Sequence, residues 1–276
     1  MNMLLKDQII ILALQEDIGH GDLTTESVIP AEQQAKAIIK AKEKLVVCGL
    51  EVAARVFYLL DPGLRFLARV CDGQRVEAGT VVAEISGSAR ALLTAERTAL
   101  NFLQRLSGIA TKVSHYVNLL QGTSARLVDT RKTTPGHRDF EKYAVRCGGG
   151  YNHRFGLSDG ILIKDNHLKI AGGIEQAVRM ARAAAPHLTR IEVEIDSLDQ
   201  IDECLAARVD CILLDNMTPD ELRKGVERIN HQCLTEASGG VCEENIREIA
   251  RAGVDLISVG ALTHTIQAVD LNMEIA

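Results

Sequence analysis

The sequence predicts an α/β protein made of two parts: a parallel β/α domain of six or seven strands, and before it an N-terminal part of mixed helices and strands. Two observations support this fold class. From residue 126 onward, short apolar strands alternate with helical stretches, and the strand starts from residue 161 recur every 20 to 30 residues. That spacing and alternation are typical of β/α units around a parallel sheet. Before residue 110 the pattern is mixed and lacks this repeat.

The N-terminal part alternates short helices and strands that are separated by turn residues. Asp61-Pro62-Gly63 ends one helix, and Asp72-Gly73 is predicted to form a turn between two strands. We expect helices at 7–16 and 49–60, a strand region at 35–47, and strands at 64–70 and 79–85.

A long helix follows. Its apolar residues recur at steps of three, four and seven and form one stripe. Arg97 lies two positions before Ala99, about 200° around the helix from it, so Arg97 faces away from this helix's own core. The stripe consists of Leu92, Ala99, Leu103, Leu106, Ala110, Val113 and Val117.

Six strands are predicted in the second part. About 150 residues remain for it, whereas an eight-stranded barrel needs about 200 or more. The alternatives are therefore a reduced barrel and an open doubly wound sheet. No G-x-G-x-x-G follows the first strand, which weakens a dinucleotide-binding version. The strands are 126–129, 161–164, 191–195, 211–215, 234–237 and 256–259.

Composition excludes several classes of protein. The chain has 276 residues and a net charge of −6, which argues against nucleic-acid binding. The apolar run Ile9–Leu14 is too short for a membrane span. The seven cysteines are odd in number and include no C-x-x-C pair, so neither a zinc site nor a disulfide framework is indicated. Reduced thiols favour a cytoplasmic location.

One segment is basic within this acidic chain. Residues 126–154 carry seven Lys and Arg against three Asp and Glu. An anionic small-molecule ligand and a solvated basic loop explain that excess about equally well on charge alone.

Polar residues or glycines end nearly every strand of the second part. One such end usually caps the next helix, but six in succession favour a site, because the active site of parallel β/α folds lies at the carboxyl ends of the strands. These ends are Asp129-Thr130-Arg131-Lys132, Lys164-Asp165-Asn166, the alternating Glu192, Glu194 and Asp196, Asp215-Asn216, Glu236-Ala237-Ser238-Gly239-Gly240, and Gly260.

The residue types at these ends indicate the ligand. Cations follow the first two strands, and carboxylates follow the third and fourth. Ser238-Gly239-Gly240 is expected to lie at the start of a helix and to present backbone N–H groups to a phosphate. Gly260 is expected to complete this phosphate-binding site. A simple tight turn also explains Ser-Gly-Gly. The whole pattern predicts a phosphate-bearing substrate with sugar hydroxyls and a second anionic group.

Motifs along nearly the whole chain resemble the quinolinate phosphoribosyltransferases. Tyr151 occupies a variable family position, and Thr265-Ile266-Gln267 departs from the usual sequence. The motifs, in family order, are Glu16–Asp22, Ala95–Asn101, Leu106–Thr111, Asp129–Gly136, Glu141–Gly150, Asn152-His153-Arg154, Ile163–His167, Glu192-Val193-Glu194, Leu214-Asp215-Asn216, Glu236–Gly240 and Gly260–His264.

The resemblance implies a domain division and an assembly. Residues 1–110 are expected to form an N-terminal α/β sandwich domain, 111–264 a barrel-like catalytic domain of seven strands, and 265–276 to return to the first domain. It also implies a homodimer, or an assembly of dimers, in which Arg97 enters the neighbour's active site.

The implied reaction joins quinolinate to phosphoribosyl pyrophosphate and gives nicotinate mononucleotide, pyrophosphate and CO₂. Mg²⁺ is implied through the substrate phosphates, with Glu194 and Asp215 as its protein contacts. Lys132, Lys164, Glu194 and Asp215 match catalytic positions. Substrate contacts match these four and Arg97, Thr130, Arg131, His153, Arg154, Ser238, Gly239, Gly240, Gly260 and His264.

Three alternatives remain at this stage. One is a related phosphoribosyltransferase-like protein associated with molybdenum transport. Another is a Schiff-base aldolase with Lys164 as its nucleophile. The third is a non-catalytic phosphosugar-binding barrel, in which the carboxylates of Glu194 and Asp215 have no evident task.

Overall fold

The computed structural model describes residues 3–276, with side chains from residue 6 onward, as two compact units. The first unit comprises the residues up to Ser114, Thr134–Gly149 and Thr265–Ala276. The second comprises His115–Thr133 and Gly150–His264. The sequence predicted one boundary near residue 110. In the structure, residues 134–149 also group with the first unit, because the helix they contain packs there.

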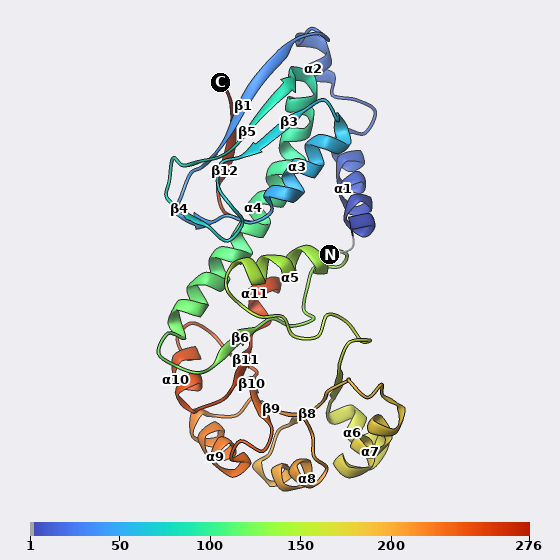
Figure 1. Ribbon diagram of the computed structural model, residues 1–276, viewed down its shortest axis with the longest axis vertical. Helices are drawn as coiled ribbons and strands as arrows, with labels where there is room; N and C mark the ends of the chain where they lie inside the picture. Colours follow the sequence, from blue (N-terminus) through green and yellow to red (C-terminus); the bar gives the residue numbers. More distant parts are fainter. Residues whose placement is uncertain (1–2) are drawn as a thin grey trace. The chain divides into compact units, whose positions relative to one another are not determined.

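The first unit contains a four-stranded antiparallel sheet in the order β12-β1-β5-β3. Its inner strand β1 pairs with β5 on one side and with the last strand, β12, on the other (Figure 1). The strands are β1 (Gln34–Ala41), β3 (Arg65–Ala68), β5 (Val81–Ser88) and β12 (Leu271–Ile275).

The predicted turn at Asp72-Gly73 does not join two strands of this sheet directly. β3 and β5 pair as expected, but β4 (Arg75–Val76) lies between them in sequence and pairs with β2 (Leu45–Val46) in a separate two-stranded ladder. The Asp72 side chain accepts hydrogen bonds from the backbone N–H groups of Gly49 and Leu50, where a helix begins. The aspartate therefore serves a helix start that is distant in sequence.

The helices α3 and α4 of this unit each bury an apolar face. Helix α3 buries Val52, Ala53, Val56 and Phe57, which recur with helical spacing. The predicted stripe of the long helix is confirmed except at its end, where Val117 is half-buried. Arg97 is exposed, and the other six residues of the stripe are buried, namely Leu92, Ala99, Leu103, Leu106, Ala110 and Val113. The helices are α1 (Met3–Ile18), α2 (Leu23–Val28), α3 (Leu50–Leu60), α4 (Ala89–Leu119) and α5 (Arg138–Cys147).

The second unit contains a six-stranded parallel sheet in the order β6-β11-β10-β9-β8-β7. Successive strands from β7 to β11 are neighbours, and β6 joins next to β11, which is the order of a barrel and not of a doubly wound sheet. Tyr151 adds an isolated parallel bridge to Val128 at the free edge of β6. The strands are β6 (Arg126–Val128), β7 (Ile161–Ile163), β8 (Ile191–Ile195), β9 (Cys211–Asp215), β10 (Leu234–Ser238) and β11 (Leu256–Ser258).

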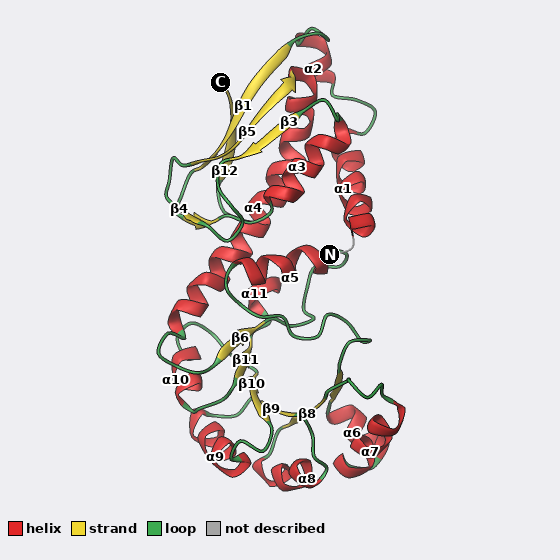
Figure 2. Cartoon of the chain, viewed as in Figure 1, coloured by secondary structure: helices red, strands yellow, loops and turns green. Residues whose placement is uncertain are grey.

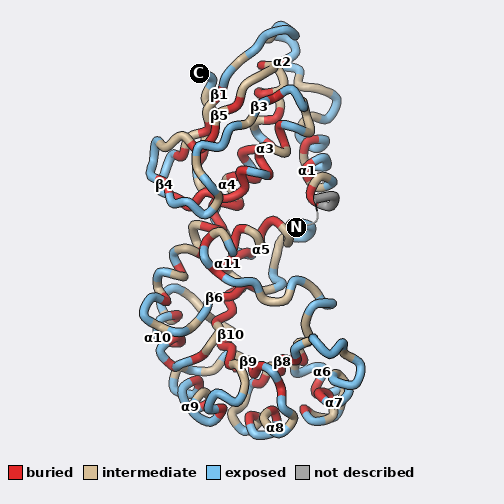
Figure 3. Tube along the Cα trace, viewed as in Figure 1, coloured by how far each residue is buried: buried red, intermediate tan, exposed pale blue. Residues whose placement is uncertain are grey.

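Helices cover the outer side of this curved sheet, and the strands lie inside them (Figure 2). Strands β8 to β10 are largely buried, whereas the outer helix faces are exposed (Figure 3). Within residues 3–276, none of the helices combines the length and the apolar character that crossing a bilayer requires. The helices are α6 (Asp165–Ala171), α7 (Ile174–Ala184), α8 (Ile201–Ala206), α9 (Pro219–Ile229), α10 (Ile246–Arg251) and α11 (Ala261–His264).

Candidate active site

A pocket of about 780 Å³ lies in the second unit, at the carboxyl ends of its parallel strands. Its lining contains all the site residues predicted from the sequence except Arg97, which is exposed on α4 in the first unit. The predicted residues that line it are Thr130, Arg131, Lys132, His153, Arg154, Lys164, Glu194, Asp215, Ser238, Gly239, Gly240, Gly260 and His264. The polar residues predicted at the strand ends therefore line one continuous cavity.

Positive charge collects on one part of this pocket. Burial lowers the pKa of Arg154, and the positive charge of Arg131 lowers it further, so the two guanidinium groups repel each other. Arg154 also donates a hydrogen bond to the carbonyl of Gly160 at 2.9 Å, which fixes its direction. Placing two cations together costs free energy that an anion can recover, so this arrangement favours an anionic ligand.

The carboxylates of Glu194 and Asp215 come from neighbouring strands. Lys164, directly after β7, forms an ion pair with Glu194 at the end of β8. Asp215, at the end of β9, accepts a hydrogen bond from the Asn216 side chain at 2.7 Å. Lys164 and Asn216 thus orient the two carboxylates, and both carboxylates line the pocket.

Glycines form the backbone wall of the pocket. A Cβ on Gly239, whose φ is +88°, would come within 2.1 Å of Asn216 Oδ1, and a Cβ on Gly260 would come within 2.9 Å of Lys132 Cδ. Gly240 also has a positive φ, +60°. The expectation that Ser238-Gly239-Gly240 opens a helix was wrong. Helix α10 begins at Ile246, and the intervening loop is held by the Asn245 side chain, which donates to the carbonyl of Gly240.

A buried aspartate anchors the segment that carries His153. Asp129 accepts hydrogen bonds from the Asn152 side chain at 2.7 Å and from the backbone N–H of His153 at 2.8 Å. The backbone N–H of Arg154 donates to His153 Nδ1 at 2.7 Å, so the ring proton of a neutral His153 lies on Nε2. That nitrogen is 3.0 Å from a carboxylate oxygen of Glu192.

Two further glutamates belong to this region and were not among the predicted site residues: Glu236 lines the pocket, and Glu192 contacts the pocket residue His153. Glu236 is 1 % exposed, and neither of its carboxylate oxygens has a hydrogen-bond partner among the described residues. Burial, followed by the charge of Glu192, raises the pKa of Glu236 to about 7. The alternation of Glu192 and Glu194 along β8 was visible in the sequence, but it could not show that Glu192 is buried against Glu236.

Two groups in this unit contain the ligand types of a cation site. His153, Glu192 and Glu236 each offer an atom, and these three atoms lie within 4.8 Å of one another. Glu194 and Asp215 line the open pocket and supply only oxygen ligands. Oxygen ligands with space for further oxygens suit Mg²⁺, which keeps waters and substrate phosphates in its coordination shell.

Comparison with known proteins identifies the family. The family description "Quinolinate phosphoribosyl transferase, C-terminal domain" matches residues 109–274, and the corresponding N-terminal domain matches residues 22–107. The chain belongs to the quinolinate phosphoribosyltransferase family. A relative in this family, the probable nicotinate-nucleotide pyrophosphorylase [carboxylating] of Bacillus subtilis, is 46% identical over 260 residues, covering 94% of this chain and 90% of the relative.

Other quinolinate phosphoribosyltransferase relatives extend over both units. The probable nicotinate-nucleotide pyrophosphorylase [carboxylating] of Methanocaldococcus jannaschii is 41% identical and covers 99% of each chain. The solved structure of the nicotinate-nucleotide pyrophosphorylase from Francisella tularensis has a TM-score of 0.95 and 39% identity, and the match covers 99% of this chain and 96% of that one. The family and the fold predicted from the sequence are thereby confirmed.

Proposed function

We infer that this protein transfers the phosphoribosyl group of phosphoribosyl pyrophosphate to quinolinate and releases pyrophosphate and CO₂ to give nicotinate mononucleotide. One observation carries the inference: a single pocket combines the cations of Arg131, Lys132, Arg154 and Lys164 with carboxylates and a glycine-lined wall. Family membership supports the same reaction, because the relatives are named for it. The product places the enzyme in the biosynthesis of pyridine nucleotides.

The acceptor side of the pocket is assigned to Arg131 and Arg154, with Thr130 and His153 beside them. Quinolinate carries two carboxylates, and planar guanidinium groups bind carboxylates through two parallel hydrogen bonds. The mutual repulsion of these arginines decreases when a dianion lies between them. A monocarboxylate leaves one cation without its partner, so nicotinate should be a much poorer substrate.

The donor side is assigned to the loops after β10 and β11. Backbone N–H groups of Ser238, Gly239, Gly240 and Gly260 would bind the 5-phosphate, with His264 at the rim, because glycine lets the backbone approach an anion closely. Lys132 and Lys164 would bind the pyrophosphate. Glu194 and Asp215 would hold the ribose hydroxyls, and with the substrate phosphates they would hold Mg²⁺, which supplies charge neutralisation when bound.

The chemistry then follows from charge. Departure of pyrophosphate leaves positive charge on the anomeric carbon, and the carboxylates of Glu194 and Asp215 stabilise it, while the lysines stabilise the leaving group. Lys164 must leave or share its ion pair with Glu194 as substrate enters. After ribosylation the ring nitrogen is cationic and stabilises the carbanion left when the adjacent carboxylate departs as CO₂. That carbon then takes up a proton from water to give the product, and the pocket's task at this stage is to hold the ring in place.

The aldolase alternative loses support from the same geometry. A Schiff base requires a neutral amine, and the Lys164 ammonium is paired with Glu194. Borohydride with a carbonyl substrate should therefore trap no adduct at Lys164.

The test is to incubate the protein with phosphoribosyl pyrophosphate, Mg²⁺ and quinolinate, and to follow nicotinate mononucleotide by chromatography. We expect product with quinolinate and little with nicotinate at the same concentration. Comparable turnover of nicotinate would reject the assignment of a dicarboxylate site. Omission of Mg²⁺, with a chelator present, tests the metal separately.

We also propose a homodimer, or an assembly of dimers, in the cytoplasm, in which Arg97 acts in the neighbour's site. The exposure of Arg97 on the face of α4 opposite its buried stripe supports this. The test mixes Arg97→Ala subunits with Lys164→Ala subunits. Random exchange into two-fold dimers should restore about a quarter of wild-type activity, because one site in each mixed dimer is intact. No recovery, with exchange shown by mass spectrometry, would place Arg97 outside a shared site.

A further inference from the structure

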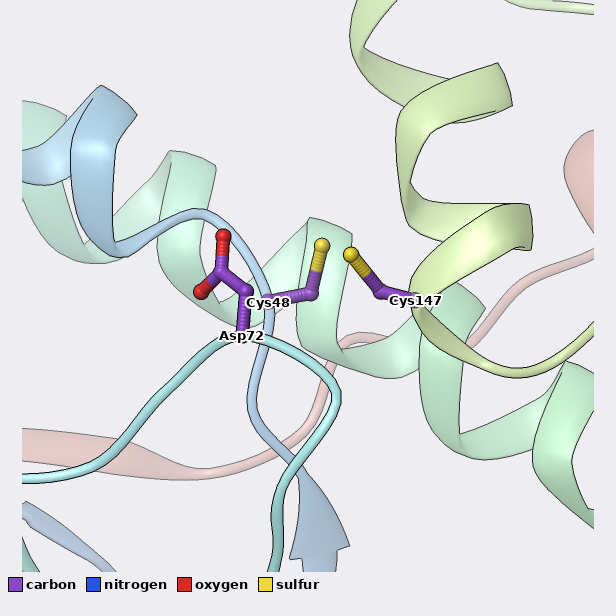
Figure 4. Close-up of side chains that lie close together, drawn as sticks. All are labelled: Cys48, Asp72 and Cys147. Carbon is purple, nitrogen blue, oxygen red and sulfur yellow. The ribbon is translucent and has the colours of Figure 1, made fainter.

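The first unit contains a pair of thiols that the proposed reaction does not use. Cys48 precedes helix α3, and Cys147 is the last residue of α5. Their sulfur atoms and a carboxylate oxygen of Asp72 lie within 4.8 Å of one another. Figure 4 shows the two sulfurs pointing toward each other, with Asp72 on the other side of Cys48. Cysteines that are far apart in sequence are thus brought into contact by the fold.

The backbone holds both thiols in place. The Cys48 N–H donates to Ser107 Oγ at 2.9 Å, and that hydroxyl donates back to the carbonyl of Cys48 at 3.2 Å. Next to Cys147, Gly148 packs so closely against α4 that a Cβ would come within 2.5 Å of the Ala110 carbonyl oxygen. The position of each sulfur is therefore set by packing around it and not by loop motion.

The two thiols differ in exposure and in the direction in which their surroundings shift their pKa values. Cys147 is partly exposed, and its pKa is lowered, first by hydrogen bonding with Cys48. Cys48 is fully buried, and hydrogen bonding to Cys147 together with burial raises its pKa. A more acidic accessible thiol beside a buried one is the arrangement of an attacking and a resolving cysteine.

A metal ion is a weaker explanation of this cluster. Asp72 Oδ1 already accepts from the N–H groups of Gly49 and Leu50, at 3.0 and 3.1 Å, and Oδ2 accepts from the Tyr143 hydroxyl at 2.8 Å. Binding a metal through this carboxylate would break one of these bonds. Structural zinc also takes four ligands, whereas the described residues supply three here.

We propose that Cys48 and Cys147 form a reversible disulfide when the protein meets a small disulfide oxidant such as oxidised glutathione. The Cys147 thiolate attacks one sulfur of the oxidant and expels one glutathione thiolate. Cys48 then loses its proton and attacks Cys147 Sγ, which expels the second. Two electrons pass from the protein thiols to the oxidant, and the sulfurs close from at most 4.8 Å to the bonding distance of about 2 Å.

Disulfide formation would affect the segment that follows Cys147. Gly148 to Gly150 lead directly to Asn152 and His153, which Asp129 holds at the pocket. Oxidation would tie the start of that segment covalently to the residue before α3. The thiol pair is thus a modification site at the entry of a segment that carries pocket residues.

The test treats the folded full-length protein with oxidised glutathione and maps peptides without reduction. We expect a Cys48–Cys147 linked peptide, the loss of two of the seven thiols when they are counted after unfolding the treated protein, and full reversal by dithiothreitol. Cys48→Ser should stop at a glutathione adduct on Cys147, and Cys147→Ser should give no adduct at Cys48. Cys71→Ser, which removes an exposed cysteine, is the matched control and should still form the link.

Two results would overturn the proposal. One is a glutathione adduct on Cys147 of the wild-type protein that does not proceed to the linked peptide. The other is stoichiometric zinc in the purified protein that is lost in Cys48→Ser. Neither result bears on the quinolinate assay, so failure here is distinguishable from failure of the proposed function.

Discussion

Two carboxyl groups, one in each unit, are bound in opposite ways. Asp72 in the first unit accepts three hydrogen bonds, two from backbone N–H groups and one from Tyr143. Glu236 in the second unit is almost fully buried, yet neither of its oxygens has a hydrogen-bond partner among the described residues. A carboxylate whose hydrogen bonds are all made stabilises the fold. Within the described chain, Glu236 has only the His153 ring, with Nε2 at 3.7 Å, as its nearest cation, and this ion pair recovers only part of the free energy that burial costs. The difference separates the structural polar network from the one that belongs to a site.

The largest effect should come from removing a pocket cation. Lys132→Ala should lower the rate of nicotinate mononucleotide formation by about 10²–10³-fold, the usual cost of one lost electrostatic contact in a transition state. The free energy of unfolding should stay unchanged, because the Lys132 side chain is exposed. Lys224→Ala, at an exposed position on α9, is the control and should keep full activity. Equal losses in both variants would contradict a specific role for Lys132.

The pH dependence of the stability of Glu236→Gln, compared with wild type, tests the carboxyl group that lacks hydrogen bonds to the described residues. The pKa of Glu236 is about 7 in the folded chain against an ordinary value of 4.5, so between these pH values the folded state binds more protons than the unfolded state. The contribution of Glu236 to the free energy of unfolding therefore falls as pH rises from 4.5 to 7 and is constant above that. The difference in stability between Glu236→Gln and wild type should rise by on the order of 3 kcal/mol over that range.

Urea unfolding of both proteins at pH 5 and pH 8 measures this change. Glu236→Gln should gain on wild type at the higher pH. A stability difference that does not depend on pH would show that Glu236 is not a strained acid in the folded chain.

Asp72→Asn tests the satisfied carboxylate. The amide nitrogen cannot accept from the Tyr143 hydroxyl, so that hydrogen bond must reverse its direction or be lost, and the two backbone N–H groups lose a charged acceptor. The free energy of unfolding should therefore fall by about 1–3 kcal/mol. The rate per folded molecule should be unchanged, since Asp72 lies outside the pocket lining. Chemical denaturation and steady-state kinetics on the same sample separate the two effects. A lower rate per folded molecule without a loss of stability would contradict a purely structural role for Asp72.

Tyr143→Phe should have the smallest effect. It removes only the hydroxyl that donates to Asp72 Oδ2, and it should cost about 1 kcal/mol in the free energy of unfolding. Thermal unfolding of Tyr143→Phe and Asp72→Asn under the same conditions shows which variant loses more stability. A larger loss for Tyr143→Phe would mean that the tyrosine, and not the aspartate, organises this cluster.

The sequence predicted the features that depend on the spacing of apolar residues along the chain and on the order of the parallel strands. The six strands of the second unit follow from apolar runs at regular spacing, and their polar ends predicted the pocket because parallel strands end at one edge. Family motifs supplied the reaction. These features depend on neighbours in sequence or on a single topological rule.

What the sequence missed depends on contacts between distant residues. Asp72 lies in a turn, as predicted, but its hydrogen bonds to the start of α3 were missed because Leu50 is distant in sequence. Glu236 looked like one more strand end, because only the fold shows that it is buried against Glu192. The thiols of Cys48 and Cys147 gave no motif, because their spacing carries no signal.

The pairing of β12 with β1 also fixes an order of events during synthesis. Strand β1 leaves the ribosome early, but β12 exists only after every strand of the second unit has been made. Until then one edge of β1 presents unpaired N–H and C=O groups, which are a template for pairing with other chains. The second unit is therefore complete while the first still lacks a strand. A chain that ends between residues 264 and 271 therefore carries an open β edge in its first unit.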